Sequence, residues 1–239
     1  MKISKRILSI IFAISLIIIC FFSSIDLLIY ADCPKFFINE CKKYNCLEIV
    51  GITEEDLTEV SVEMFDYLKA KRENLSDIYT TINGEPNVAY FNEKECRHMA
   101  DCQKLFVGGM NIRRGCIYIC IIILAALAFL NRRNLKEIFL DLSKGMVAGT
   151  IAFFTALAAV GGMFAINFDK YFTKFHLMFF DNDDWILDAT RDRLLMIMPE
   201  EFFMDCVRDI VLIFAAMMII LLTASIIYIK HEKKSSINS

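Results

Sequence analysis

The stretch Ile7–Tyr30 (ILSIIFAISLIIICFFSSIDLLIY) decides the fold, because it is apolar throughout apart from its serines and Asp26. At a rise of about 1.5 Å per residue, a helix of this length can cross a hydrocarbon layer of about 30 Å. Lys2, Lys5 and Arg6 precede the stretch, so a signal peptide is the alternative interpretation. The apolar run is long for a signal peptide and no small-x-small cleavage site follows it, which favours an uncleaved membrane helix.

Three further runs have the same apolar character: Gly115–Leu130, Met146–Phe168 and Cys206–Ile229. The first of them is short for a span, so we expect its helix to begin earlier, near Leu105. The chain is 56% hydrophobic, and the excess lies in these runs, as is typical of membrane spans. We therefore predict an all-α membrane fold with four transmembrane helices, at residues 7–31, 105–130, 146–168 and 206–229.

Basic residues near the ends of the spans predict the orientation of the chain. They gather before the first span, between the second and third, and after the fourth. These residues are Lys2, Lys5, Arg6, Arg132, Arg133, Lys136, Lys144, Lys230, Lys233 and Lys234. All three groups lie on one side only if both termini, 1–6 and 230–239, and the loop 131–145 are cytoplasmic. The acidic segments 32–104 and 169–205 then lie outside the cell.

The first outer segment, 32–104, predicts a small extracellular α+β cap that is too short for an independent enzyme domain. The residues after Thr53 follow a helical pattern in which four apolar side chains share one face. These are Leu57, Val60, Met64 and Leu68.

A hairpin and a further helix are predicted later in the same segment. Residues 83–86 (NGEP) form a turn between the strand-like runs 78–82 and 88–91. Asn92 is then the predicted N-cap of a helix that carries His98 and continues into the second span.

The second outer segment, 169–205, is rich in aromatic residues. They are Tyr171, Phe172, Phe175, Phe179, Phe180, Trp185, Phe202 and Phe203. An aromatic belt at the membrane surface is the first interpretation, and an aromatic-walled pocket at that depth is the second.

Six cysteines fall outside or at the outer border: Cys33, Cys41, Cys46, Cys96, Cys102 and Cys206. They form disulfides in a pairing that the sequence does not reveal, or they remain free thiols. No C-x-x-C pair is present, which argues against a zinc ribbon or a thioredoxin-like site.

Other familiar signatures are absent from the sequence, including the G-x-S-x-G nucleophile elbow and the H-E-x-x-H zinc motif. No span holds an ionisable residue near its middle, which argues against an ion or proton pathway. The formal net charge of −3 argues against a nucleic-acid partner. No sequence feature indicates an oligomeric state.

The chain has three histidines, of which His231 lies in the lysine-rich tail. His98 precedes the second span by about two helical turns, and His176 follows the third span by a similar length. If those helices are neighbours, both imidazoles lie at one depth. Each histidine alone is more typical of a structural residue, whereas the pair in an aromatic setting favours function. A metal site completed by Asp181 or Asp183 is the alternative, although the spacing matches no zinc pattern.

Two motifs carry a resemblance to a known family. They are Phe91–Asp101 (FNEKECRHMAD) and Phe175–Asp188 (FHLMFFDNDDWILD), the latter followed by Asp192–Leu194 (DRL) and Met198–Phe203 (MPEEFF). With the four-helix layout and the cap, they make the chain resemble a bacterial membrane family that includes lipoprotein intramolecular transacylase.

The resemblance implies an acyltransferase of the bacterial cell membrane. Family members with known activity move an acyl chain within one diacylated lipoprotein, from the sn-2 position of the diacylglyceryl group to the α-amine of the N-terminal cysteine. The product is a lyso-form lipoprotein. Two histidines carry the reaction in those members, and they match His98 and His176. The implied partners are the lipoprotein and membrane lipid, and we expect no cofactor or metal.

Imidazole suits this transfer chemically. The amine, with a pKa near 8, must lose a proton, and the departing glyceryl oxygen must gain one. We expect one neutral and one protonated histidine, with His98 as the base and His176 as the acid, or the reverse.

Further residues are predicted to orient the histidines or to bind substrate. Asp101, three positions after His98, orients its ring or is an exposed charge. Three loop residues orient His176, bind the substrate head region or form a turn: Asp181, Asn182 and Asp183. The candidates for the pocket wall are Tyr90, Phe91, Phe175, Phe179, Phe180 and Trp185.

Two other functions remain open at this point. A non-catalytic membrane module that binds lipid or lipopeptide needs the aromatic wall but not both histidines. A lipid hydrolase uses the same histidines with water as the nucleophile.

Overall fold

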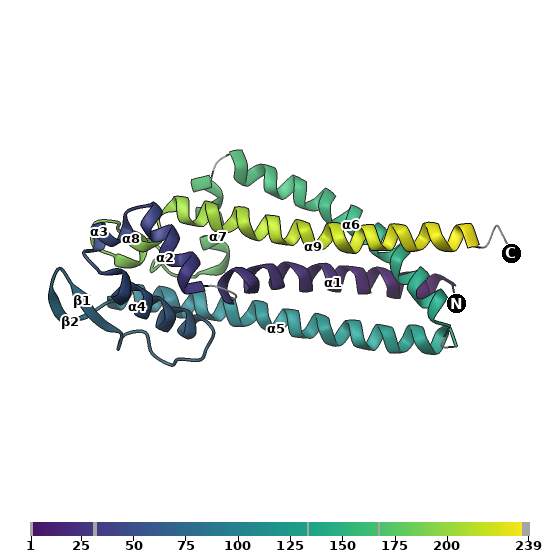
Figure 1. Cartoon of the computed structure of the whole chain (residues 1–239), viewed down its shortest axis with the longest axis horizontal. Coiled ribbons are helices and arrows are strands. Elements are labelled where there is room, and N and C mark those ends of the chain that lie inside the picture. Colours follow the sequence, from purple (N-terminus) through teal and green to yellow (C-terminus); the bar gives the residue numbers. More distant parts are fainter. Residues whose placement is uncertain (1, 31–32, 133, 167, 236–239) are drawn as a thin grey trace. The chain divides into compact units, whose positions relative to one another are not determined.

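The computed structural model describes residues 2–30, 33–132, 134–166 and 168–235 (Figure 1). The chain divides into two compact units. The helical unit comprises Met1–Ser24, Asn111–Tyr171 and Val211–Ser239. The mixed unit comprises Ile25–Met110 and Phe172–Ile210.

Among the described residues, four helices are long and apolar enough to cross a membrane. They are α1 (Lys2–Tyr30), α5 (Glu93–Leu130), α6 (Leu135–Ile166) and α9 (Glu200–Ser235). The prediction of four apolar helices is therefore confirmed. All four begin earlier than the predicted spans, because each helix also includes polar residues that precede its apolar run.

In the helical unit, α1 and α6 pack at very short range. A Cβ atom added to Gly145 of α6 would lie 2.4 Å from the carbonyl oxygen of Ser9, and one added to Gly149 would lie 3.0 Å from the Ala13 Cβ. Both partners on α1 are buried. Small residues four apart let two membrane helices approach closely, and the glycines provide that contact here.

The mixed unit combines short helices with a hairpin and with the first turns of α5 and α9. Its own elements are α2 (Cys33–Lys43), α3 (Cys46–Val50), α4 (Glu54–Leu68), β1 (Tyr79–Ile82), β2 (Glu85–Ala89) and α8 (Arg193–Ile197). The helix α7 (Phe168–Phe179) enters this unit at Phe172.

The predicted helix after Thr53 is confirmed as α4. The Thr53 hydroxyl accepts a hydrogen bond from the Asp56 backbone N–H at 3.1 Å, which caps the helix. The four apolar residues of the predicted face are all buried: Leu57, Val60, Met64 and Leu68.

The hairpin is present, but its turn is shorter than predicted. Asn83 and Gly84 alone form the turn, with φ angles of 51° and 81°, whereas Glu85 and Pro86 belong to β2. A two-residue turn with both φ angles positive matches the right-handed twist of paired strands, which explains why the strands close directly around Asn-Gly.

The start of α5 is fixed by a reciprocal cap. The Asn92 side-chain oxygen accepts from the Glu95 N–H at 2.9 Å, and the Glu95 carboxylate accepts from the Asn92 N–H at 2.7 Å. The second carboxylate oxygen accepts from the Leu194 N–H at 2.6 Å. Asn92 is thus the predicted N-cap, and Glu95 ties the beginning of α5 to α8.

Candidate active site

The mixed unit brings His98 and His176 together. His98 extends from α5 and His176 from α7, and their ring centroids lie 6.1 Å apart with an interplanar angle of 35°. The residues are far apart in sequence, and the capped first turns of α5 hold one of them while α7 presents the other. The two imidazoles are therefore close neighbours in the folded unit.

Aromatic rings surround His176, whose side chain is only 7% exposed. Trp185 stacks on the imidazole at 4.7 Å with an angle of 26°. Phe172 lies at 4.2 Å, Phe180 at 5.4 Å and Phe175 at 5.5 Å. Phe180 also lies 5.5 Å from His98, so it contacts both histidines.

The proton on His176 can be placed from its backbone contact. Its Nδ1 lies 2.8 Å from the Phe172 carbonyl oxygen. A carbonyl oxygen can only accept, so Nδ1 must carry the hydrogen. Burial lowers the pKa of His176 below its usual value, so the ring is neutral near pH 7 and Nε2 presents a lone pair.

His98 is also held neutral. Burial, and then the nearby His176, lowers the pKa of His98 to about 4, against the opposing charges of Asp101 and Asp184. The structure therefore differs from the expectation of one neutral and one protonated ring. Removal from water disfavours the charged form of both imidazoles, an effect that sequence spacing does not reveal.

A thiol lies next to His98. The Cys102 sulfur, one turn later on α5, is 3.6 Å from Nε2 and 4.0 Å from Nδ1 of the His98 ring. Burial raises the pKa of Cys102 to about 12. The sulfur is therefore present as a neutral thiol and contacts the ring as a weak hydrogen-bonding group.

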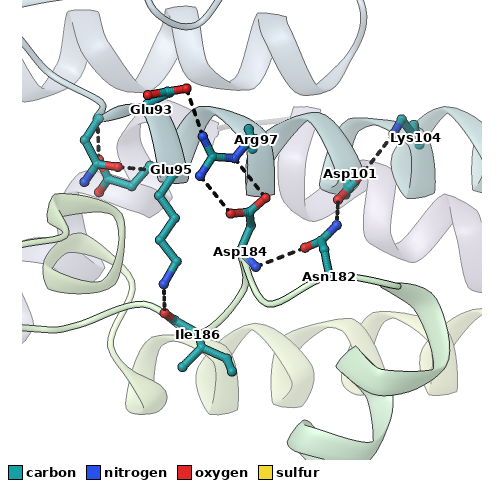
Figure 2. A network of polar contacts seen from close by, with 10 residues as sticks. Glu93, Glu95, Arg97, Asp101, Lys104, Asn182, Asp184 and Ile186 are labelled. Atoms are coloured by element: carbon teal, nitrogen blue, oxygen red, sulfur yellow. Dashed lines mark hydrogen bonds and ion pairs between the residues drawn. The ribbon is translucent and has the colours of Figure 1, made fainter.

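Polar contacts tie the loop after α7 to α5 (Figure 2). Arg97 donates from Nε and Nη2 to the two carboxylate oxygens of Asp184, each at 3.0 Å. Asn182 donates to Asp101 at 2.8 Å, and Lys94 donates to the carbonyl oxygen of Ile186. We call these contacts the strap.

Several predicted site residues lie elsewhere. Tyr90 and Phe91 belong to the hydrophobic core of the mixed unit and are 0% and 4% exposed. Their ring contact, at 4.8 Å, is with each other, and within the described part of the chain neither ring contacts a histidine. The structure therefore places both rings in the core of the mixed unit and not beside the histidines, because the apolar residues that follow β2 pack inward.

The polar residues predicted to orient the histidines or to bind substrate lie in the strap or in an exposed turn. The Asp101 oxygens accept from Lys104 at 2.7 Å and from Asn182, and among the described contacts neither oxygen bonds the His98 ring. Asp181 and Asp183 are exposed. The Asn182 side chain accepts from the Asp184 N–H at 3.0 Å, as expected for the loop-turn interpretation.

The remaining aromatic candidates differ in their contacts. Phe179 is 49% exposed and lies 4.8 Å from Phe175, which itself contacts His176. The rings of Phe175, Phe180 and Trp185 thus reach the histidines directly, and Phe179 extends the aromatic surface outward.

Sequence reasoning missed four residues around the site: Lys94, Arg97, Phe172 and Asp184. Lys94 and Arg97 lie three residues apart on one helix, and residues 181–184 (DNDD) form an acidic loop motif. These opposite charges were the signal that could have predicted the strap. The Phe172 carbonyl belongs to the backbone, so the identity of the residue could not predict its contact with His176.

The cysteines of the mixed unit and the possible metal ligands form no further centre in the part of the chain that the structure describes. Cys41, Cys46, Cys96 and Cys102 are free thiols, and the side chain of Cys33 lies outside the described residues. Within the same residues, no group of three His, Cys, Asp or Glu side chains has the arrangement of a metal site.

A family model described as lipoprotein intramolecular transacylase Lit matches residues 10–203. The structure is similar to that of the membrane integral lipoprotein intramolecular transacylase Lit from Bacillus cereus, with a TM-score of 0.72, 19% identity, and coverage of 98% of this chain and 100% of the other.

Two variant structures of the Bacillus cereus protein are also similar. In one a histidine is replaced by arginine and in the other by alanine. Each gives a TM-score of 0.71 at 19% identity over 98% of this chain, covering 96% and 97% of the other chain. The comparison with curated protein sequences gave no match. Because the family model spans most of its length, the chain belongs to the family of the lipoprotein intramolecular transacylase Lit.

Proposed function

We propose that the protein is a lipoprotein intramolecular transacylase that moves the sn-2 acyl chain of a diacylglyceryl group to the α-amine of the N-terminal cysteine. The observation that carries this proposal is the pair of imidazole rings, with centroids 6.1 Å apart among aromatic side chains, in a chain of this family. The product is the lyso-form lipoprotein.

The transfer needs a base for the amine proton. The neutral amine attacks the ester carbonyl carbon, an N–C bond forms, and the nitrogen must then lose a proton. His176 is suited to accept it, because its Nδ1–H is bonded to the Phe172 carbonyl and its Nε2 lone pair remains. This assignment reverses the first of the two orders expected from sequence.

The leaving oxygen needs the same proton that the amine loses. When the C–O bond breaks, the glyceryl oxygen takes a proton from the imidazole pair, and the pair returns to its neutral starting state. We assign His98 to this side of the reaction. His98 donates its N–H proton to the glyceryl oxygen and receives the proton that His176 took from the amine. Neither histidine therefore needs to be protonated before the reaction begins.

The intramolecular nature of the reaction reduces what the protein must supply. Nucleophile and ester belong to one molecule, so alignment alone yields effective concentrations on the order of 10⁵ M or more. The acyl chains are assigned to the aromatic surface of Phe175, Phe179, Phe180 and Trp185, which also excludes competing water. The loop 181–183 is assigned to the lipoprotein head region.

The proposed membrane placement follows the apolar sequence. The spans are residues 7–31, 105–130, 146–168 and 206–229, with both termini cytoplasmic and the segments 32–104 and 169–205 outside. His98 then precedes the hydrocarbon-crossing part of α5, within reach of the outer leaflet where a lipoprotein presents its amine. The apolar lengths of α1, α5, α6 and α9 support this placement.

The deciding experiment is mass spectrometry of a diacylated lipopeptide incubated with the purified protein. Transfer yields a product of unchanged mass whose amine is acylated, whereas hydrolysis yields a lyso lipid with a free amine. His98→Asn and His176→Asn are each expected to abolish the product while the protein still folds and inserts. Bound lipopeptide with no product in the wild type would instead identify a binding module.

A further inference from the structure

The strap fastens one short loop to one face of α5. Its three positions on the helix, Lys94, Arg97 and Asp101, are three and four residues apart, so they project from the same side. Their partners are the Ile186 carbonyl, Asp184 and Asn182, as Figure 2 shows. The loop is thus held on both sides of residue 185.

Trp185 occupies the position between these attachments. Its ring stacks on His176 at 4.7 Å, and its indole N–H is buried with no acceptor among the described residues. No hydrogen bond of its own therefore fixes the ring. Its place over His176 depends on the stacking contact and on the backbone that the strap holds.

The Arg97–Asp184 pair is the most directional attachment. Two parallel N–H···O bonds of 3.0 Å restrict the carboxylate in both position and angle. The pair is also half open to solvent, with side-chain exposures of 51% and 21%. Exposed ion pairs contribute little to folding because water screens their charges, so the main effect of this pair is on where the loop lies.

We infer that Arg97 and Asp184 are positioning residues of the active site, which hold Trp185 over His176 and so keep water from the proposed base. The inference rests on the proposed function. Without the pair, the loop moves, Trp185 leaves the imidazole and water gains access to the reacting ester. The reaction then slows and part of it is diverted to hydrolysis.

Trp185 provides a direct optical test, because it is the only tryptophan in the chain. We expect Arg97→Gln and Asp184→Asn to shift its emission to longer wavelength and to increase quenching by acrylamide. With the lipopeptide substrate, kcat should fall about 10- to 100-fold, the size expected of a small misplacement of reacting groups, while KM changes less. The hydrolysed lyso lipid should appear as a side product.

A matched control is available in the same unit. Arg72 pairs with Glu63 at 2.6 Å and with Asp77 at 2.7 Å. Among the described contacts, none joins these three residues to His98 or His176. Arg72→Gln removes a comparable arginine pair and should leave the emission, kcat and product ratio unchanged. Equal effects in Arg72→Gln and Arg97→Gln would overturn the inference, because a general loss of stability would then explain both.

The double variant Arg97→Gln/Asp184→Asn tests whether the two residues act as one device. It should be no slower than the slower single variant, since the first substitution already breaks the pair. Unchanged emission and kcat in both single variants would overturn the positioning role. If the wild type forms no product at all, the proposed function fails, and the tryptophan emission alone then decides whether the strap holds the loop.

Discussion

His176 donates from Nδ1 to the carbonyl oxygen of Phe172, one turn earlier on the same helix, over 2.8 Å. The bond fixes both the tautomer and the rotation of the ring, so Nε2 faces away from the helix backbone as an acceptor. Trp185 covers one face of the same ring. A base prepared in this way needs no partner carboxylate to select its tautomer.

The pH dependence of transfer should reflect the substrate amine more than the histidines. Both imidazoles have lowered pKa values, about 4 for His98, and a base acts in its neutral form, which is present above its pKa. Between pH 7.5 and 6, kcat/KM should therefore fall about tenfold per unit, following the neutral fraction of an amine with a pKa near 8. Initial rates on a lipopeptide at low concentration measure this slope.

A second, steeper fall is expected at lower pH as the imidazoles gain protons, His176 below the usual histidine pKa and His98 near pH 4. Burial and the nearby His176 and Lys94 oppose protonation of His98, whereas Asp101 and Asp184 favour it. With a substrate whose amine has a lower pKa, the first decrease in kcat/KM should move to lower pH, whereas the second should stay at the same pH. An added break in slope near pH 6.5 would contradict buried, neutral imidazoles.

Cys102 should not serve as a nucleophile despite its contact with His98. Burial raises its pKa to about 12, so only about one thiol in 10⁵ is ionised at pH 7. We expect Cys102→Ala to retain activity within about threefold, because the lost S–H···N contact is weak. Product formation and a search for a hydroxylamine-sensitive acyl adduct on the wild-type protein check both points.

A thioester on Cys102, or complete loss of transfer in Cys102→Ala with normal folding, would instead indicate an acyl-enzyme. Cys96→Ala is the matched control, since that thiol lies on the same helix and is half-buried but has no contact with either histidine among the described residues.

Patterns local in sequence were predicted well. The four apolar helices follow from composition and length, α4 from the spacing of its apolar face, and the start of α5 from the Asn92 cap. Each of these features depends on residues within a few turns of one another. The hairpin was predicted too, although its predicted turn was too long because proline, here Pro86, is typical of turns and Pro86 belongs to β2 in the structure.

Contacts between distant segments were harder to predict. Motif resemblance and shared distance from the membrane were enough to pair His98 with His176. They were not enough to show that Arg97 binds Asp184, that Trp185 stacks on His176, or that Tyr90 points to the core. These details depend on how α5, α7 and the following loop pack, and residue type alone allows several arrangements.

Glu95 should stabilise the mixed unit, because it accepts one backbone hydrogen bond from the cap of its own helix and one from the distant helix α8. Its side chain is 1% exposed and accepts from Asn92 and Leu194. Glu95→Gln turns one acceptor into a donor that faces an N–H, so about 1–3 kcal/mol of folding free energy should be lost. Thermal unfolding in detergent measures the loss. Glu93→Gln, in the same turn but 92% exposed, should change the midpoint little.

Gly145 should be intolerant of any side chain, because α1 occupies the space where a Cβ would lie. The added atom would sit 2.4 Å from the Ser9 carbonyl oxygen, which is backbone and cannot rotate away. Gly145→Ala should therefore force α1 and α6 apart and cost about 1–3 kcal/mol, the usual size of an overpacking penalty. The unfolding midpoint in detergent provides the measurement.

The control for this substitution is Gly115→Ala on α5, where an added Cβ meets no atom within 4 Å. Alanine is the better helix former, so this variant should be as stable as the wild type or slightly more so. Equal midpoints for Gly145→Ala and Gly115→Ala would mean that α1 and α6 are not packed backbone to backbone at Ser9. The transfer activity of Gly145→Ala, measured below its midpoint, should stay close to that of the wild type, because its contacts lie within the helical unit and the histidines lie within the mixed unit.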